Sequence, residues 1–373
     1  MVFAVVLILL VIGSVLFHFL SPWYLTPLAS NWSTIDDTLG LTLWITGILF
    51  VVINLFLAYC VIKFRYNKDK RAHYEPENKK LEIWLTVGTA IGVAAMLTPG
   101  LYVWADFVNP PKDADVFEIV GKQWSWKYRF PGDDGILGSV DTRHITSDNP
   151  FGMNSDDPNG QDDVLISSGE VHLPIDRPVK LLMRSDDVLH DFAVAEFRVK
   201  MDMVPGMVTQ MWFTPTKLGE YDVLCEELCG VGHYNMRGLV VVDEENDFKT
   251  WLNTYPTYAQ TLSGEGAAAA TEGLSLVEQG RELSKLYACT ACHSIDGSTG
   301  IGPTWQGLFG KTETLADGTT VVVDADYLKE SILNPNAKMV EGYQPLMPPT
   351  VVTDEELDAL IAYIKEGLVE KSE

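Results

Sequence analysis

Three long apolar segments in the first third of the chain constrain its fold more than any other feature. They cover residues 2–20, 41–62 and 81–104. A helix needs about 20 apolar residues to cross the hydrocarbon core of a membrane, and each segment is long enough. The third segment contains Glu82 near its start and Pro99 near its end, both of which are tolerated at membrane edges. The sequence therefore predicts three transmembrane helices, with the lipid bilayer as a partner.

The first apolar segment could instead be a secretory signal peptide, because it is N-terminal. No Lys or Arg precedes it, however, and no clear pair of small residues marks a cleavage site within residues 21–30. These two features favour a helix that is retained in the membrane.

The loop between the second and third apolar segments is rich in positive charge. Its basic residues are Lys63, Arg65, Lys68, Lys70, Arg71, Lys79 and Lys80. Loops that carry many Lys and Arg residues stay on the cytoplasmic side of a membrane. Three helices then place the N-terminus inside the cell and everything after about Asp106 outside the membrane.

The chain as a whole is acidic and long enough for more than one domain. It has 51 Asp and Glu residues against 27 Lys and Arg residues, a net charge of −24 over 373 residues. This balance argues against nucleic-acid binding, because nucleic acids attract basic surfaces. It favours a soluble face that attracts basic partners or cations, and the length predicts two or three domains.

Short runs with β-strand character fill the chain from residue 116 to residue 242. Examples are residues 116–120, 124–130, 179–183, 207–213 and 239–242. Short strands at this spacing predict an antiparallel sandwich or a Greek-key barrel. A polar insertion at 141–163 interrupts them, and its many Asp, Asn and Gly residues indicate a solvated loop more than a calcium site.

The rest of the chain predicts a tether followed by a small helical domain. Residues 261–273 are mostly small, which is typical of a flexible tether. Helices are expected at 275–287 and 353–368, and the second begins with the capping box Thr353-Asp-Glu-Glu356. So small a domain needs a staple or a cofactor to be stable.

A cysteine pair in this C-terminal domain lies in Cys289-Thr-Ala-Cys292-His293. Two thiols in one helical turn can add to the two vinyl groups of heme while the next His binds the iron, and this spacing is the attachment signature of heme c. The alternatives are a disulfide or half of a zinc site, but zinc needs further Cys or His ligands and none follows His293. Gly302-Pro303 suits a loop whose carbonyl accepts the other imidazole proton.

A heme that transfers electrons is expected to have a thioether as its sixth ligand, because Met raises the potential. Met339 and Met347 are the candidates. Met347 lies in Gln344-Pro-Leu-Met347-Pro-Pro, where prolines stiffen the loop that must present sulfur to iron. We therefore assign Met347, and expect Met339 to pack against the heme or the surface.

The second cysteine pair lies in Cys225-Glu-Glu-Leu-Cys229-Gly-Val-Gly-His233-Tyr-Asn-Met236. Two nearby cysteines in an oxidising compartment ordinarily form a disulfide, which would not explain the His and Met that follow them. Thiolate, thioether and imidazole together select copper, whereas Met is a poor zinc ligand. Since a blue copper site needs only one Cys, the second thiolate indicates two metals with bridging sulfurs.

Such a centre needs another imidazole from elsewhere in the chain. His190, in Val-Leu-His190-Asp-Phe-Ala-Val, lies about one strand pair upstream and fits this role. His144 and His172 lie beside the insertion or at the start of a strand, where surface positions are more common.

These residues resemble cytochrome c oxidase subunit II, in particular its caa-type variety with a fused cytochrome c domain. The resemblance covers about residues 41–368, and the motif Cys-x-Glu-x-Cys-x-x-x-His-x-x-Met is matched throughout. It implies that Cys225 and Cys229 bridge the two coppers of a CuA centre. The other implied ligands are His190, His233, Met236 and the backbone carbonyl of Glu227. The Glu227 side chain is implied to reach a magnesium ion at the interface with subunit I.

Two further segments are similar to the family. Gln123-Trp124-Ser-Trp126 matches its aromatic segment, which implies that Trp124 accepts electrons from the cytochrome. Glu82 is similar to the family's carboxylate at the mouth of a proton channel. The alternatives are an ordinary core aromatic residue at Trp124 and a solvated carboxylate near the basic loop at Glu82.

The resemblance implies a multidomain membrane protein. Its expected parts are transmembrane helices in 1–105, an all-β cupredoxin-like Greek-key sandwich in 106–260, the linker 261–273, and a small all-α class I cytochrome c domain in 274–373. A multi-pass protein of the bacterial inner (cell) membrane is implied, with the CuA and heme c domains on the periplasmic side.

The implied function is that of an oxidase subunit. Electrons would pass from heme c to CuA and on to subunit I, which holds hemes and copper B and reduces oxygen to water with proton pumping. Subunit III and a donor, cytochrome c or another cytochrome, are further implied partners. A CuA-containing nitric oxide reductase subunit and a free-standing membrane-anchored electron carrier are the alternatives, and Glu82 with the aromatic segment favours the oxidase over the carrier.

Overall fold

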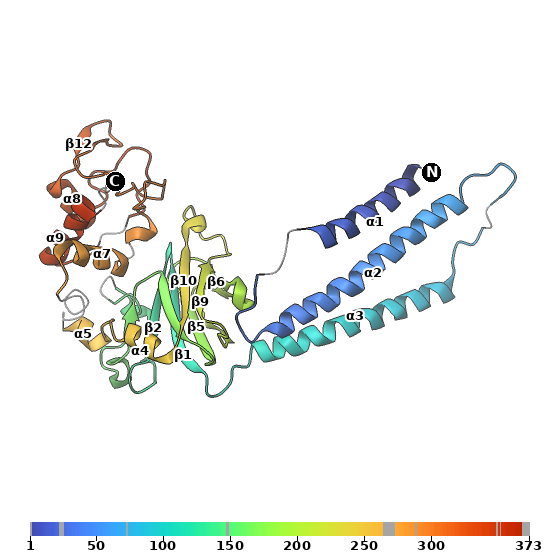
Figure 1. Cartoon of the computed structure of the whole chain (residues 1–373), viewed down its shortest axis with the longest axis horizontal. Coiled ribbons are helices and arrows are strands. Elements are labelled where there is room, and N and C mark those ends of the chain that lie inside the picture. The colour runs from blue at the N-terminus through green and yellow to red at the C-terminus, as the bar shows by residue number, and fades with distance from the viewer. Residues whose placement is uncertain are drawn as a thin grey trace. The chain divides into compact units, whose positions relative to one another are not determined.

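The computed structural model describes residues 2–21, 26–71, 74–146, 149–263, 273–287, 289–347, 350 and 352–367 (Figure 1). The chain divides into two compact units. One comprises Met1–Leu28 and Trp32–Asn109, and the other comprises Ala29–Asn31 and Pro110–Glu373.

The first unit consists of three helices, α1 (Val2–Leu20), α2 (Ser33–Lys63) and α3 (Lys79–Phe107). Within the described residues, these are the helices whose length and apolar composition suffice to cross a membrane. Ala4 and Leu7 of α1 pack against Ala58 of α2. Most other apolar side chains in these helices are exposed, as expected for surfaces that face lipid. The prediction of three apolar spans is thus confirmed by length and composition.

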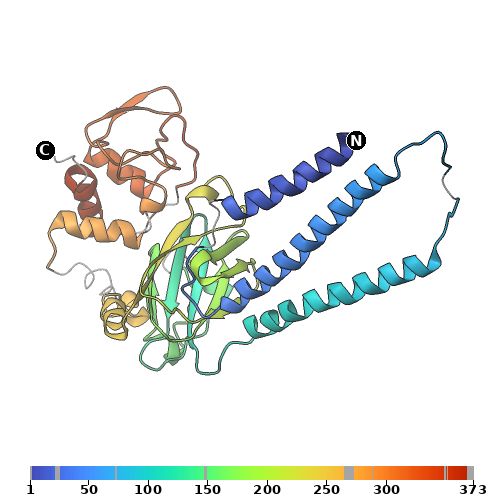
Figure 2. The ribbon, with the colours of Figure 1, turned by 45° about the vertical axis from the view of Figure 1, so that its right-hand side comes forward.

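The second unit begins with a β-sandwich of two five-stranded sheets (Figure 2). The first sheet has the order β3 (Val164–Ile166), β2 (Ser125–Phe130), β1 (Asp115–Lys122), β5 (Val179–Ser185) and β8 (Thr209–Phe213). The second has the order β4 (Glu170–Pro174), β10 (Arg237–Asp243), β9 (Gly219–Leu224), β6 (His190–Val194) and β7 (Val199–Met203). Short 3-10 turns connect them at η1 (Thr142–His144), η2 (Pro158–Gly160), η3 (Ala195–Phe197) and η4 (His233–Asn235).

The sandwich is mixed, so the expectation of purely antiparallel pairing is wrong in two places. Strand β1 runs parallel to β5, and β10 runs parallel to β4. A parallel pair needs a long connection, and the chain between β1 and β5 supplies one. Alternating side chains reveal a strand's buried face but not the direction of its neighbour, so the sequence pattern did not distinguish these pairs.

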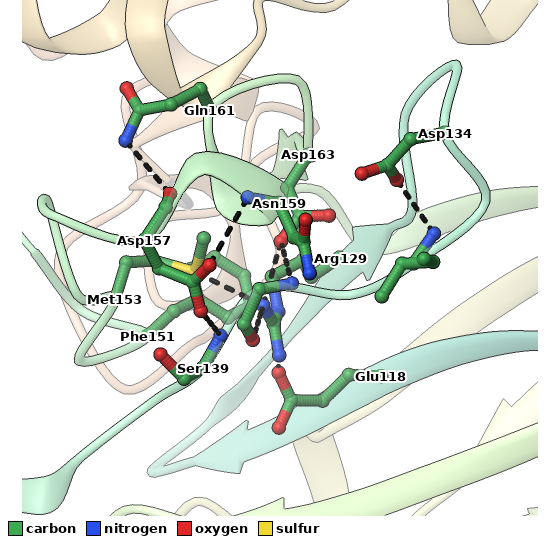
Figure 3. Close-up of polar contacts among 12 residues, drawn as sticks. Glu118, Arg129, Asp134, Ser139, Phe151, Met153, Asp157, Asn159, Gln161 and Asp163 are labelled. Atoms are coloured by element: carbon green, nitrogen blue, oxygen red, sulfur yellow. Dashed lines mark hydrogen bonds and ion pairs between the residues drawn. The ribbon is translucent and has the colours of Figure 1, made fainter.

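Part of the insertion is folded onto the first sheet, and the expectation of a solvated loop is wrong for its buried residues 151–153 and 163 (Figure 3). Phe151 and Met153 are each 1% exposed. The buried guanidinium of Arg129, on β2, lies 2.7 Å from both Glu118 and Asp163 and donates to the Gly138 carbonyl at 2.8 Å. A buried charge requires partners, and the insertion supplies one of these acceptors, Asp163. Its polar composition concealed this ion-pair network.

Two helices complete the sandwich, α4 (Glu245–Leu252) and α5 (Tyr258–Leu262). Tyr258 donates its backbone N–H to the Asp163 carbonyl and its side chain is buried beside the insertion. Thr261 and Leu262, the first residues of the predicted tether, form the end of α5, so the tether prediction is wrong there. Residues 264–272 lie outside the described residues.

The C-terminal part is mainly helical, as predicted. Its elements are α7 (Leu276–Leu286), η5 (Cys289–Ala291), β11 (Thr312–Thr314), β12 (Thr320–Val322), α8 (Ala325–Leu333), α9 (Asp354–Ala362) and η6 (Tyr363–Gly367). The capping box of Thr353 and Glu356 begins α9. Helices α7 and α9 cross closely at Gly280, where a Cβ atom would lie 1.9 Å from the Ala359 carbonyl oxygen. Trp305, Tyr327 and Leu357 contribute to the core beneath them.

Candidate metal centres

The sandwich brings three separated residues together at one edge. His190 is the first residue of β6, Cys225 directly follows β9, and Cys229 lies in the loop that leads to β10. Their side-chain ligand atoms all lie within 4.8 Å of one another, and all three residues are buried. The register that pairs β6 with β9 places the histidine beside the loop, as the spacing in the sequence predicts.

The remaining predicted copper ligands surround the two sulfurs. The Sγ atoms of Cys225 and Cys229 are 3.7 Å apart, well beyond the length of about 2.05 Å of a disulfide bond. His233 Nδ1 lies 3.6 Å and Met236 Sδ 3.9 Å from Cys229 Sγ. The Glu227 carbonyl oxygen lies 3.3 Å from Cys225 Sγ. Two soft sulfurs, two imidazoles, a thioether and a carbonyl fit a two-copper centre.

Protonation in this cluster also fits a metal site. Burial raises the pKa of Cys225, but the combined interactions with neighbouring groups, led by His190, outweigh burial and lower the pKa to about 6. Burial and the neighbouring Cys225 sulfur raise the pKa of Cys229 to about 12. His190 Nδ1 is buried without a hydrogen-bond partner among the described residues. A bound cation would supply the positive charge that a second buried thiolate requires, and its binding would release the proton.

Trp124 contacts the loop at 225–236 directly, which we call the copper loop because it carries most of the predicted copper ligands. It lies in the turn between β1 and β2, so its expected place within a strand is wrong. Its indole Nε1 donates to the Cys229 carbonyl at 3.1 Å, and Gln123 Nε2 donates to the same oxygen at 2.7 Å. The loop passes so close that a Cβ atom at Gly232 would lie 2.3 Å from Trp124 Cδ2. Trp126, by contrast, is a core aromatic residue on β2.

The copper loop also contacts the segment that carries the heme motif. Asn235 Nδ2 donates to the backbone carbonyl of Ala291, which lies between the two cysteines of that motif. A Cβ atom at Gly232 would lie 2.4 Å from Ile301 Cδ1. Both contacts lie within the second compact unit.

The candidate heme site is built around His293. Cys289 begins the short turn η5, and Cys292 follows it. His293 Nδ1 donates to the Pro303 carbonyl at 2.8 Å, as the sequence predicts, which leaves Nε2 for iron. The imidazole stacks on Trp305 at 5.3 Å, and Met347 packs against the same hydrophobic core. Two cysteines, an oriented imidazole and a nearby thioether fit a covalently bound heme.

Of the other predicted site residues, Glu227 lies in a charged cluster of the sandwich and Glu82 lies in α3. Lys200 Nζ is 3.7 Å from Glu227 and 3.7 Å from the buried Asp191, next to His190. Glu82 is exposed in the first turn of α3. Sequence reasoning missed two residues that contact the copper site, Gln123 and Asp187. The signal for Asp187 is an acidic residue three positions before a predicted metal-binding histidine.

Family models match both parts of the second unit. Residues 116–244 match "Cytochrome C oxidase subunit II, periplasmic domain", and residues 277–367 match "Cytochrome c". An alternative cytochrome c oxidase subunit 2 from Bradyrhizobium diazoefficiens is 57% identical over 267 residues, which cover 72% of this chain and 96% of that protein. The chain belongs to the cytochrome c oxidase subunit 2 family. A cytochrome c oxidase subunit 2 from Alkalihalophilus pseudofirmus is 24% identical over 344 residues, covering 89% of this chain and 86% of that protein.

Among solved structures, the chain is similar to the periplasmic domain of cytochrome oxidase subunit II from Bradyrhizobium japonicum. It is 28% identical, with a TM-score of 0.29, and the match covers 39% of this chain and 96% of that chain. Membership of the cytochrome c oxidase subunit 2 family implies a CuA copper site in the sandwich, and the cytochrome c match implies heme in the C-terminal part. Membership also makes the chain part of an electron-transferring oxidoreductase complex with subunit I.

Proposed function

We propose that this subunit accepts electrons at heme c, passes them to the dinuclear CuA centre and delivers them to subunit I, which reduces oxygen to water with proton pumping. The observation that carries this proposal is the arrangement of copper donors around Cys225 and Cys229. The thiolates of Cys225 and Cys229 would hold the coppers, and the centre would accept and release one electron at a time. The full proposed ligand set is His190, Cys225, Glu227, Cys229, His233 and Met236.

At the heme site, Cys289 and Cys292 would hold the porphyrin covalently and His293 would bind its iron. The hydrogen bond to Pro303 fixes the ring plane of His293, which favours one ligand geometry through repeated oxidation and reduction. Met347 is the proposed sixth ligand. Its packing against the core that includes Trp305 supports this choice. Met339 has its backbone carbonyl engaged by Ala316 beside the β11–β12 hairpin.

Trp124 is the proposed residue through which electrons reach CuA. Its hydrogen bond to Cys229 supports this role, because it joins an aromatic ring to the backbone of a copper ligand. The contact of Ile301 with Gly232 supports heme c as the internal donor.

The wider assembly is also part of the proposal. Three apolar helices favour a multi-pass protein of the bacterial inner membrane, with both cofactor domains on the periplasmic side. Glu82 is the proposed carboxylate at a proton channel mouth, and Glu227 the proposed magnesium ligand facing subunit I. Subunit III and an external cytochrome donor complete the expected partners.

The test is to purify the complex that contains the full chain and to identify its metals and substrate. We expect two coppers per chain with a delocalised mixed-valence spectrum, covalent heme c, and oxygen uptake driven by a reduced cytochrome. Reconstituted vesicles should acidify outside as oxygen is consumed. Consumption of nitric oxide without oxygen uptake would instead identify a nitric oxide reductase. A chain isolated without any catalytic partner would identify a free-standing carrier.

A further inference from the structure

Asp187 lies in the turn between β5 and β6 and contacts two parts of the copper site at once. Its Oδ1 lies 2.8 Å from His190 Nε2, and it also accepts the Val188 backbone N–H at 2.7 Å. Its Oδ2 accepts the backbone N–H of Gln123 at 2.8 Å. The carboxylate is about three-quarters buried, with 24% of the side chain exposed. Because both oxygens of the Asp187 carboxylate accept hydrogen bonds, this residue is part of the local structure and not a solvated surface charge.

The first contact determines which nitrogen of His190 is free for a metal. An ionised carboxylate only accepts hydrogen bonds, so Nε2 must carry the proton that it donates to Asp187. In the neutral imidazole Nδ1 is then unprotonated. This nitrogen is buried without a hydrogen-bond partner among the described residues, which leaves it for a metal at the cluster that His190 forms with Cys225 and Cys229. A carboxylate behind a metal-binding imidazole both orients the ring and makes the ligand more basic.

The second contact fixes the turn that carries Trp124. Gln123 is held from one side by Asp187 and from the other by the Cys229 carbonyl, which its side chain reaches. Trp124 donates to that same carbonyl. Hydrogen bonds thus run from His190 through Asp187 and Gln123 to Cys229, so that one carboxylate ties a copper ligand to the aromatic turn.

We propose that Asp187 is a positioning residue that sets both the ligand geometry of His190 and the place of Trp124 against the copper loop. This inference rests on the proposed role of the six-donor cluster as CuA. It assigns Asp187 a task inside the site, whereas the simplest rival is that its charge only attracts a basic donor protein. The two differ in what they predict for the copper centre itself, with no donor present.

The neighbouring Asp186 provides a matched control. It bears the same charge one position away, but its carboxylate interacts with Lys127 and Lys122. The substitution Asp186→Asn therefore removes an equal charge near the site without touching His190 or Gln123. Asp187→Ala removes both hydrogen-bonded connections. Asp187→Asn retains an oxygen that can accept from His190, but its amide nitrogen cannot accept from Gln123.

The experiment compares these variants in the purified complex with the full chain. Expected in Asp187→Ala are about a 10- to 100-fold weaker retention of copper against a competing chelator, a raised CuA reduction potential and altered copper hyperfine splittings. Asp187→Asn should retain copper better than Asp187→Ala while slowing electron transfer into CuA. Asp186→Asn should match the unsubstituted protein in copper retention, spectrum and transfer rate.

The outcomes separate this inference from the function on which it rests. If the unsubstituted chain holds no mixed-valence copper pair, the proposed function fails. If the pair is present and both Asp187 variants behave like Asp186→Asn, positioning by Asp187 is refuted. Should Asp187→Ala bind no copper at all, Asp187→Asn decides, because a spectrum, potential and transfer rate unchanged in that variant would equally refute the proposal.

Discussion

Trp124 Nε1 and the Cys229 carbonyl oxygen are 3.1 Å apart, so an indole ring is hydrogen-bonded to the backbone of a proposed copper ligand. The ring is 6% exposed. This relationship explains why an aromatic residue in a turn, rather than in a strand, can serve the copper site. The turn lies outside the backbone hydrogen bonds that pair β1 with β2, so the side chains of Gln123 and Trp124 can contact the loop before β10.

The substitution Trp124→Phe tests the proposed electron path. Phe keeps an aromatic ring but loses the N–H donor, while Gln123 still donates to the Cys229 carbonyl, so loss of the hydrogen bond should cost about 1 kcal/mol of stability. We expect intact copper spectra and about tenfold slower heme-to-copper transfer after flash reduction, equivalent to about 1.4 kcal/mol in the barrier. Trp126→Phe is the control, since it makes the same change at a core aromatic residue of the same segment. An unchanged internal rate in Trp124→Phe would remove this residue from the path.

The assignment of Met347 is tested by replacing it with Ala. Covalent heme should remain, because Cys289 and Cys292 are unchanged, but its potential should fall and the iron should bind added imidazole or cyanide. Loss of a half-buried thioether from the core should also cost about 2 kcal/mol. Met339→Ala is the matched control. The assignment of Met347 would be wrong if the heme iron bound added ligands in Met339→Ala but not in Met347→Ala.

The proposed proton channel is tested by Glu82→Gln. If Glu82 admits protons, the variant should reduce oxygen more slowly while electrons still reach CuA at the normal rate. The control is Glu77→Gln, which removes a carboxylate from an exposed pair with Lys79 at 3.9 Å. Such surface pairs contribute little, so this variant should turn over normally. Equal turnover in both variants would leave Glu82 as an ordinary interfacial carboxylate.

The buried ion pairs that hold the insertion can be tested by Arg129→Met. This substitution leaves Asp163 buried without its guanidinium, which should destabilise the sandwich by about 3–5 kcal/mol. Arg143→Met is the control, because Arg143 is exposed and its pair with Asp141 should contribute little to stability. Thermal loss of the copper spectrum and protease cleavage within 131–163 provide the measurement. Equal thermal midpoints for loss of the copper spectrum in the two variants would contradict a structural role for the ion pairs of Arg129.

The sequence indicated most of the candidate site because its donors are local. Cys225 to Met236 form one loop, and the heme motif spans one helical turn, so spacing alone predicts their chemistry. What spacing could not show depends on contacts between distant positions. Arg129 meets Asp163 across 34 residues, and Gln123 meets Asp187 across 64. The polar insertion and the aromatic turn were misplaced for this reason, since composition and strand propensity describe segments one at a time.

The fused heme domain leads to the final prediction, which concerns ionic strength. The contacts beside the copper loop involve Ile301, Gly232 and the amide of Asn235, none of which is charged. A covalently joined domain also has an effective concentration of about millimolar, so internal transfer needs no charge steering. An external basic donor, by contrast, must find a chain of net charge −24, and salt shortens the Debye length to about 10 Å at 0.1 M. Raising salt should therefore slow reduction of heme c by an external cytochrome while leaving flash-induced transfer from heme c to CuA nearly constant.

A chain truncated before α7 serves as the control for the salt dependence, because CuA should then accept electrons only from the external donor and acquire its salt dependence. Internal transfer that slowed in step with the external reaction would show that charge, not an apolar contact, brings the two sites together.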